Sequence, residues 1–388
     1  MKPLNQAQML EAMRLTQSGR LTDAVSILQR ALGANIRRVA TPAGSASRAL
    51  SPPIIEGEIV AETVSPSSAA VEPSAIAALQ SRAWKLPGSP SARVPQHADI
   101  APTAGRYISG SFSNGSGSRS YKLYIPSGKN NGPSPLIVML HGCTQSADDF
   151  AAGTRMNFAA EARGCFVVYP EQPQAANASK CWNWFRSSDQ ARDKGEPALI
   201  AGITRQVMGE NNIDPGRVYV AGLSAGGAAA AIMGEAYPDL YAAVGVHSGI
   251  ACGAARDLAS AFAAMRGQSD ISSMDRQRAG DRLMPTIVFH GDLDRTVHPS
   301  NGAKVIARAA EGNPLSDMTI RKQTSSGHNY SHSVRRDAQG RAMLELWELH
   351  RAAHAWSGGS PAGSYTNPNG PDATEEMIRF FLEHQRAR

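Results

Sequence analysis

A serine stands in a sequence context that is typical of hydrolytic nucleophiles. Ser224 lies in the pentapeptide GLSAG (222–226), between the apolar run 218–221 and an alanine-rich segment. A Gly-x-Ser-x-Gly motif between a strand and a helix forms a turn so tight that the residues two before and two after the serine must be small. The turn exposes the hydroxyl at the top of a sheet, beside the positive end of the new helix. The motif therefore predicts that Ser224 is a catalytic nucleophile.

A serine hydroxyl is a weak nucleophile and needs a histidine base oriented by a carboxylate, in the chain order Ser, Asp, His. The segment HGDLDRTV (290–297) follows an apolar run and offers two carboxylates, Asp292 and Asp294. We favour Asp294, because a short turn after the His-Gly pair would bring it over the sheet. Asp292 would then cap that turn, a common role of an aspartate beside a glycine.

The base is expected in the loop between the last strand and the last helix. His350 and His354 both lie there. We favour His354, because the glycines of its segment HAWSGG (354–359) would let a side chain reach over the site. The earlier residues His328 and His332 are expected at the surface or rim.

Acyl transfer also requires two backbone N–H groups that stabilise an oxyanion. One comes from the residue after the nucleophile, here Ala225, and the other from a loop after an earlier strand. The segment HGCTQ (141–145) follows such an apolar run. We expect the Cys143 amide to be the second donor, with the Thr144 amide as the alternative. His141 is expected to hold this loop from behind the site.

Aromatic residues occur in two loops that should lie near these groups. Trp182, Trp184 and Phe185 belong to the segment KCWNWF (180–185), and Trp356 follows the candidate base. Flat apolar rings beside a polar site would suit an alkyl ester chain. The same rings could instead anchor the loops against the core. We therefore treat Trp182, Trp184 and Trp356 as candidates for substrate binding and leave the anchoring role open.

The elements that position these groups alternate between strand and helix from Arg106 onward. Two segments, 107–112 and 120–125, bracket a turn-rich stretch and are expected to pair antiparallel at a sheet edge. Apolar runs typical of strands buried on both faces follow at 136–140, 165–169, 218–221, 242–246 and 286–290, with a further strand at 341–349. Helices are expected at 146–163, 197–210, 225–236, 301–310 and 373–384. The pattern predicts an α/β fold, with a mostly parallel sheet and helices on both faces.

Three regions differ in composition. Residues 1–34 read as a short helical hairpin, similar to a single tetratricopeptide unit. Such a unit cannot bury its own apolar face, so it should dock either on the rest of this chain or on a partner. Residues 35–103 hold nine of the 24 prolines, so we expect a flexible, disordered linker. Residues 104–388 are expected to form the catalytic domain.

The composition excludes several classes of protein. Hydrophobic residues make up 42% and charged residues 19% of the 388 positions, as in ordinary soluble globular chains. Lysine and arginine exceed aspartate and glutamate by 39 − 33 = 6, but the basic residues are scattered, so we expect no nucleic-acid partner. No stretch approaches the roughly 18 continuous apolar residues of a membrane-spanning helix.

The four cysteines are too few for a disulfide scaffold, and their spacing matches no zinc motif. We expect reduced thiols, with Cys165 buried in a strand. One bridge between two of Cys143, Cys181 and Cys252 remains open. No metal or cofactor is expected.

Five blocks of the chain resemble the poly(3-hydroxybutyrate) depolymerase esterase family, in its short-chain-length polyhydroxyalkanoate branch with a type 1 catalytic domain. The blocks are HGCTQSADDF (141–150), KCWNWF (180–185), GLSAGG (222–227), HGDLDRTV (290–297) and HAWSGG (354–359). The resemblance implies an α/β-hydrolase fold and a triad of Ser224, Asp294 and His354 that works without a metal. It also implies hydrolysis of poly(3-hydroxybutyrate) or related short-chain polyesters or oligomers through an acyl-enzyme.

Two other functions stay open at this point. Feruloyl and acetylxylan esterases are relatives of the family, and an inactive binding or scaffold protein is the alternative outside enzymology. The hairpin at 1–34 would suit a polymer granule or a protein partner.

Family members that attack extracellular polymer usually carry a signal peptide. The first residues of this sequence lack the apolar segment of a signal peptide, so we expect a cytoplasmic protein.

Overall fold

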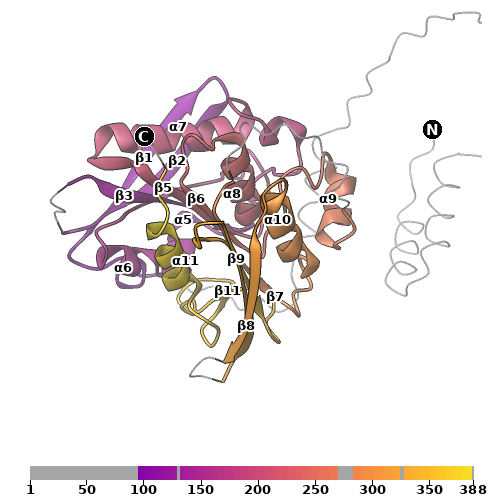
Figure 1. Ribbon diagram of the computed structural model, residues 1–388. Helices are drawn as coiled ribbons and strands as arrows, with labels where there is room; N and C mark the ends of the chain where they lie inside the picture. The colour runs from indigo at the N-terminus through magenta and orange to yellow at the C-terminus, as the bar shows by residue number, and fades with distance from the viewer. Residues whose placement is uncertain (1–94, 129–131, 270–282, 324–326, 387–388) are drawn as a thin grey trace, which may run out of the picture. The chain divides into compact units, whose positions relative to one another are not determined.

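The computed structural model describes residues 95–128, 132–269, 283–323 and 327–386 (Figure 1). Its helices and strands are, in chain order, α4 (His97–Ile100), β1 (Arg106–Asn114), β2 (Gly117–Ile125), β3 (Ser134–Leu140), α5 (Ala147–Thr154), α6 (Met156–Glu161), β4 (Phe166–Pro170), η1 (Ser187–Gln190), α7 (Gly195–Glu210), β5 (Ile213–Leu223), α8 (Ala225–Ala236), β6 (Ala243–His247), α9 (Leu258–Met265), β7 (Thr286–Gly291), α10 (Ser300–Ala310), β8 (Ser316–Gln323), β9 (Asn329–Arg336), β10 (Ala342–Leu349), β11 (Trp356–Ser357), β12 (Thr366–Asn367) and α11 (Ala373–Leu382). Within the described ranges, no helix has both the length and the apolar character needed to cross a membrane.

One large sheet organises the domain, with the strand order β1-β2-β4-β3-β5-β6-β7-β10-β9-β8. The central strands β4, β3, β5, β6, β7 and β10 run parallel to their neighbours in this series. Antiparallel strands flank them, with β1 and β2 at one edge and β9 and β8 at the other. The predicted mostly parallel sheet, with its antiparallel pair at the edge, is confirmed.

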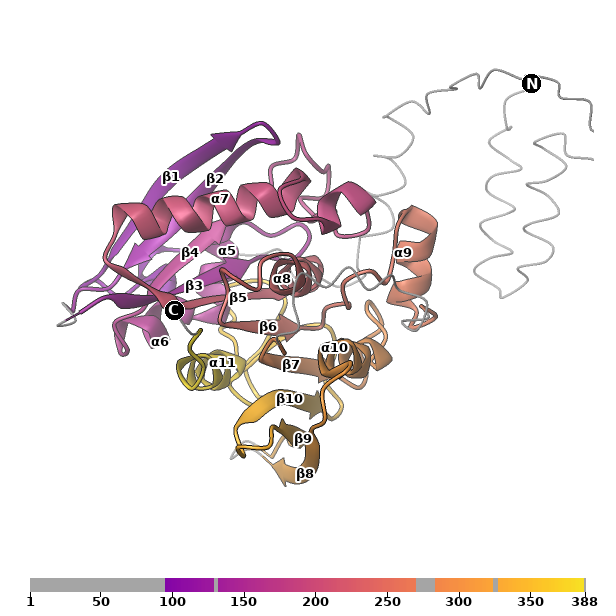
Figure 2. The ribbon, with the colours of Figure 1, turned by 45° about the horizontal axis from the view of Figure 1, so that its top comes forward.

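Helices cover both faces of the sheet because successive strand residues point to opposite faces. Leu136, Val138 and Leu140 of β3 share one apolar cluster with residues of α7, α8 and α10. Ile137 and Met139 belong to a second cluster with residues of α5, α6 and α11. Figure 2 shows α7 and α8 on one side of the strands and α6 and α11 on the other. The prediction of helices on both faces is confirmed.

The structure differs from the expected elements at two places. The helix expected over 146–163 is two helices, because Arg155 adopts a left-handed conformation (φ 56°) that ends α5 and begins α6. The segments 316–323 and 329–336 form the antiparallel strands β8 and β9, which extend the sheet beyond β10. Their sequence is largely polar because they lie at the edge, so the apolar-run criterion did not find them.

The folded domain begins earlier than residue 104. Helix α4 lies inside the segment expected to be a flexible linker, and Ile100 and Ala101 are buried in the second apolar cluster. The Asn157 side chain also donates a hydrogen bond to the Ile100 carbonyl over 2.9 Å. The hairpin expected at 1–34 and most of the linker lie outside the described residues.

Candidate active site

Ser224 occupies a strained turn between β5 and α8. Its backbone has φ 59° and ψ −120°, a region that residues with side chains rarely adopt. Glycines make the turn possible, since a Cβ at Gly222 would lie 2.3 Å from the Gly226 carbonyl and a Cβ at Gly226 would lie 2.0 Å from the Leu140 oxygen. The strain is of the kind that concentrates at functional sites, and it places Ser224 at the amino-terminal end of α8.

Asp294 and His354 are joined by a short hydrogen bond, with 2.6 Å between Asp294 Oδ2 and His354 Nδ1. The other carboxylate oxygen accepts the backbone N–H groups of Thr296 and Val297, each over 2.9 Å. Burial by itself raises the pKa of the Asp294 carboxyl, but hydrogen bonds from His290 and His354 outweigh it and hold the pKa well below its ordinary value. Asp294 is therefore a fixed negative charge beside the His354 ring.

Asp292 and His350, the other candidates, form a separate pair. Asp292 Oδ2 lies 3.2 Å from His350 Nδ1, and Asp292 Oδ1 accepts the Arg351 N–H over 2.6 Å. These two side chains remain about two-fifths exposed, at 43% and 38%. Asp292 therefore holds the start of the loop after β10, whereas Asp294 reaches the buried base.

A small cavity of about 20 Å³ brings the candidate groups together. Its wall includes Ser224, His354, Cys143 and Tyr365. In the described part of the chain Ser224 Oγ makes no hydrogen bond to the His354 ring, as is common for catalytic serines without substrate. A space of this size holds about one water molecule or one substrate oxygen.

Two backbone amides, one from a residue that lines this cavity and one from the residue after Ser224, have no protein acceptor within the described ranges. These are the N–H groups of Cys143 and of Ala225, the first residue of α8. The Thr144 amide, the alternative donor, instead gives its hydrogen bond to the Ser179 carbonyl over 2.7 Å. The geometry therefore favours Cys143 over Thr144 as a partner of Ala225 in binding an oxyanion.

His141 lies behind this loop and orients the peptide that carries the Cys143 amide. Its Nε2 accepts the Gln172 N–H over 3.1 Å, so the ring proton is on Nδ1, which donates to the Gly142 carbonyl over 2.7 Å. In a planar trans peptide the carbonyl and the next N–H point in opposite directions. Holding the Gly142 carbonyl therefore directs the Cys143 N–H the other way. Burial lowers the pKa of His141 to about 4, which keeps the ring neutral.

A disulfide connects Cys143 to Cys181, with 4.2 Å between the two Cα atoms. The expectation of reduced thiols is therefore wrong for this pair, which the sequence left as one of several pairings. The parallel pairing of β3 with β4 brings the loops after these strands together, although the two cysteines are 38 residues apart. Cys165 is buried and free, as expected, and Cys252 is also free.

The tryptophans considered for substrate binding are buried, with at most 4% of their surface exposed. The Trp182 indole donates to the His141 carbonyl over 3.1 Å, and the Trp356 indole donates to Thr374 Oγ1 over 3.0 Å. Trp184 packs edge-on against Phe185. Of the two roles left open for Trp182, Trp184 and Trp356, these contacts support loop anchoring and give substrate binding no support.

Sequence reasoning missed two buried polar residues, one beside the candidate triad and one that holds the loop after β4. His247 ends β6 and accepts the Ser357 N–H at its Nε2 over 3.0 Å. Glu196 accepts hydrogen bonds from Asn183, whose backbone N–H lies 2.7 Å away, and from the Gln172 side chain. Burial, with Asp189 nearby, raises the pKa of Glu196 to about 7. Neither residue stands in a recognisable motif, because its contacts are with loops that are distant from it in the sequence.

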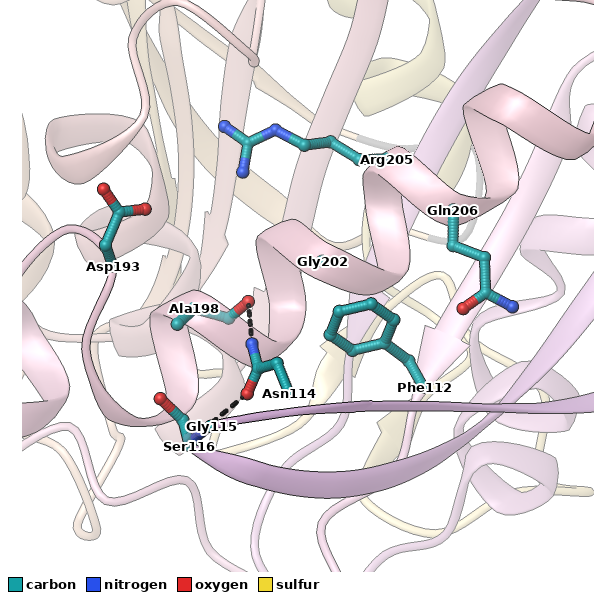
Figure 3. Close-up of a pocket in the computed structure, with 9 residues that line it drawn as sticks. All are labelled: Phe112, Asn114, Gly115, Ser116, Asp193, Ala198, Gly202, Arg205 and Gln206. Carbon is teal, nitrogen blue, oxygen red and sulfur yellow. Dashed lines mark hydrogen bonds between the residues drawn. The ribbon is translucent and has the colours of Figure 1, made fainter.

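A larger groove, of about 840 Å³, lies elsewhere, between α7 and the β1–β2 turn. Figure 3 shows Phe112 from β1 beside Gly202 of α7, with Asn114 bonded to the Ala198 carbonyl at one end. None of the residues that line it belongs to the Ser224, Asp294 and His354 constellation. Within the described residues, no group of three or more His, Cys, Asp or Glu side chains could hold a metal ion.

Comparison with known proteins identifies the family. The family model described as "Esterase PHB depolymerase" matches residues 119–329, more than half of the 388-residue chain. The chain belongs to this family. The match contains Ser224 and Asp294, and His354 follows it along the chain.

Two curated proteins that are similar in sequence to this chain are named for different activities. "Poly(3-hydroxyalkanoate) depolymerase C" of Paucimonas lemoignei is 31% identical over 254 residues, which are 63% of this chain and 59% of the relative. "Feruloyl esterase B" of Thermothelomyces thermophilus is 29% identical over 191 residues, 46% of this chain and 64% of the relative. The chain thus spans about 60% of the length of these relatives.

A solved acetyl xylan esterase from Aspergillus awamori has the same fold, with a TM-score of 0.57. The comparison covers 71% of this chain and 99% of that structure, at 18% sequence identity. Together with the strand order, this similarity confirms the expected α/β-hydrolase fold.

Proposed function

We propose that this chain is a serine hydrolase of carboxylic esters, with Ser224 as nucleophile, His354 as base and Asp294 as the carboxylate that orients the base. The observation that carries the proposal is the 2.6 Å bond between buried Asp294 and His354, at the cavity that Ser224 also lines. The amides of Cys143, which lines the cavity, and of Ala225, which follows Ser224, supply the two donors that this proposal needs for acyl transfer.

The acylation step uses these groups in sequence. Ser224 Oγ attacks the ester carbonyl carbon while its proton passes to His354 Nε2, and the carbonyl electron pair moves onto the oxygen. The amides of Cys143 and Ala225 stabilise that oxyanion. The intermediate collapses, the alcohol leaves with the proton from His354, and Ser224 carries the acyl group.

Deacylation repeats the chemistry with water. His354 takes a proton from water as its oxygen attacks the acyl carbon, and then returns the proton to Ser224 Oγ as the acid leaves. Asp294 keeps its negative charge throughout and stabilises the protonated ring of His354. Apart from the ester and water, both steps use only groups of this chain.

The substrate class we propose is poly(3-hydroxybutyrate) or a related short-chain hydroxyalkanoate polyester or oligomer. Family membership and the depolymerase relative support this choice. The feruloyl esterase relative favours a second candidate, the hydrolysis of feruloyl or acetyl esters. Initial rates on nitrophenyl butyrate, amorphous poly(3-hydroxybutyrate) and methyl ferulate separate the candidates. An inactive scaffold protein would hydrolyse none of them.

Replacement of the nucleophile tests the proposed chemistry. Ser224→Ala should lower kcat for nitrophenyl butyrate by about 10⁴-fold or more, because no other group can form the acyl-enzyme. The unfolding midpoint should stay close to that of the unaltered protein, since only one hydroxyl oxygen is lost. A variant that keeps about a tenth of the activity would show that Ser224 is not the nucleophile.

We also propose that the N-terminal region acts apart from catalysis. The hairpin at 1–34 would dock on a polymer granule or protein partner, and the part of the 35–103 segment that precedes α4 would serve as a linker. Support comes from the sequence pattern alone. The full chain and a chain that begins at Pro95 should hydrolyse nitrophenyl butyrate equally, while only the full chain should sediment with granules. Equal sedimentation of both chains would refute docking of the hairpin on a granule.

A further inference from the structure

His247 sits where the nucleophile and the base approach each other from different strands. It is the last residue of β6, and it pairs with Leu223 of β5 on one side and with Phe289 of β7 on the other. Its backbone carbonyl accepts the N–H of Ser224 over 2.9 Å. The residue is therefore in direct contact with the strained turn that carries the nucleophile.

The side chain of His247 reaches the loop that carries the base. Its Nε2 accepts the Ser357 N–H over 3.0 Å, three residues after His354. Its ring stacks on Trp356 at 5.1 Å and on Phe289 at 5.7 Å between ring centres. These contacts fix the position of the chain segment immediately after the base.

The segment before the base is held by a different contact. The Ala352 carbonyl accepts the N–H of Leu293, the neighbour of Asp294, over 3.0 Å. His354 thus lies between two backbone attachments. The first joins Ala352 to the loop that carries Asp294. The second joins Ser357 to His247, which in turn contacts the turn that carries Ser224.

The hydrogen bonds of the ring determine its protonation state. Because Nε2 accepts a hydrogen bond from the Ser357 N–H, the ring proton is on Nδ1, which lies 3.2 Å from Ser248 Oγ. Burial, and then the proximity of His290 and His354, lowers the pKa of His247 well below its ordinary value, while Asp294 opposes this shift. The ring therefore stays neutral beside His354, and a second positive charge does not compete for Asp294.

We infer that His247 is a positioning residue, which holds Ser224 and His354 at their working separation through its backbone carbonyl and its neutral ring. This inference rests on the proposed esterase function. It assigns His247 no contact with substrate and no proton transfer. Its effect is geometric, and a displacement of about 1 Å of a reacting group can cost about 10²-fold in rate.

The decisive variant is His247→Phe, which keeps an aromatic ring and removes the acceptor for Ser357. We expect kcat for nitrophenyl butyrate to fall by about 10-fold to 10²-fold, with KM changed by less than about two-fold, because substrate contacts stay intact. The acid limb of kcat/KM should move to lower pH, since a displaced His354 receives less support from Asp294 when protonated. His247→Gln, which can still accept from Ser357, should recover most of the loss.

A matched control is available at the other end of the molecule. His384 is also a buried histidine. Its ring hydrogen-bonds to the Phe380 carbonyl over 2.7 Å and packs against the Phe380 ring, with 4.4 Å between ring centres. His384→Phe therefore has a similar cost in packing and in hydrogen bonding. It should leave kcat and the acid limb unchanged.

Each outcome bears on one conclusion. Equal effects of His247→Phe and His384→Phe, with no pH shift in either, would overturn the positioning role. Should His247→Phe fail to fold, Ser248→Ala provides the test, because it removes only the partner of the ring proton and should shift the same limb by a smaller amount. If the acid limb of kcat/KM did not shift in Ser248→Ala, the positioning role of His247 would be overturned. Absence of hydrolysis by the unaltered chain would instead refute the proposed function.

Discussion

Two aspartate–histidine pairs lie where β7 and β10 end, and they differ in burial far more than in chemistry. The pair of Asp294 and His354 has side-chain exposures of 0% and 8% and a separation of 2.6 Å. The pair of Asp292 and His350 has exposures of 43% and 38% and a separation of 3.2 Å. The first pair faces the cavity of Ser224, and the second faces solvent.

The comparison shows how little the residue types alone decide. A carboxylate beside a histidine in water is screened and contributes little. The same two groups away from water interact strongly, and further donors, the N–H groups of Thr296 and Val297, favour the ionised carboxylate. Burial, together with this second set of hydrogen bonds, is what makes one pair suited to catalysis.

The largest contrast is expected from the two histidines. His354→Ala should reduce kcat for nitrophenyl butyrate by about 10⁶-fold, because the nucleophile loses its base. His350→Ala should leave kcat within about two-fold, since the loop after β10 keeps its other attachments. Steady-state rates on purified proteins measure both. A large loss in His350→Ala would assign the base to the exposed pair.

The aspartates should show a smaller contrast in the same direction. Asp294→Asn should lower kcat by about 10⁴-fold, because the amide supports neither the correct ring tautomer nor the protonated ring. Asp292→Asn should affect mainly the local turn and keep nearly full activity. Equal losses, or a larger loss in Asp292→Asn, would reverse the assignment.

The acid stability of the protein should depend on the buried aspartate. The folded state lowers the pKa of Asp294, so its charge stabilises the fold above the unfolded-state pKa of about 4, and this contribution disappears as the pH falls below that value. Urea unfolding between about pH 6 and pH 3 should therefore show a flatter loss of stability in Asp294→Asn. Asp292→Asn serves as the control. The same slope in Asp294→Asn and the unaltered protein would contradict the role of this charge.

The smallest effect is expected for the interaction between Asp292 and His350, the exposed pair. A double-mutant cycle on Asp292 and His350 should give at most about 1 kcal/mol of coupling in the free energy of unfolding. About 1 M salt should reduce that value, because it shortens the screening length to about 3 Å. A coupling of several kcal/mol that resists salt would show that the exposed pair is as well insulated as the buried one.

Much of this architecture could be predicted from local sequence. The buried strands were found because continuous apolar runs are needed where both faces of a sheet are covered. The edge strands β8 and β9 and the break at Arg155 were missed, since neither depends on an apolar pattern. The tryptophans were ambiguous for a related reason, because a ring's sequence neighbours do not reveal whether it faces a cavity or the core.

The sequence by itself determined the nucleophile turn and the order of the elements. The turn depends on steric limits between near neighbours, Gly222 to Gly226, and these limits are the same in any fold that contains them. Only the tertiary structure decided that Asp294 meets His354, that Cys143 pairs with Cys181, and that His247 contacts both sides of the site. Each of these depends on which loops the sheet order brings together and on which groups it removes from water, and both are properties of the whole fold.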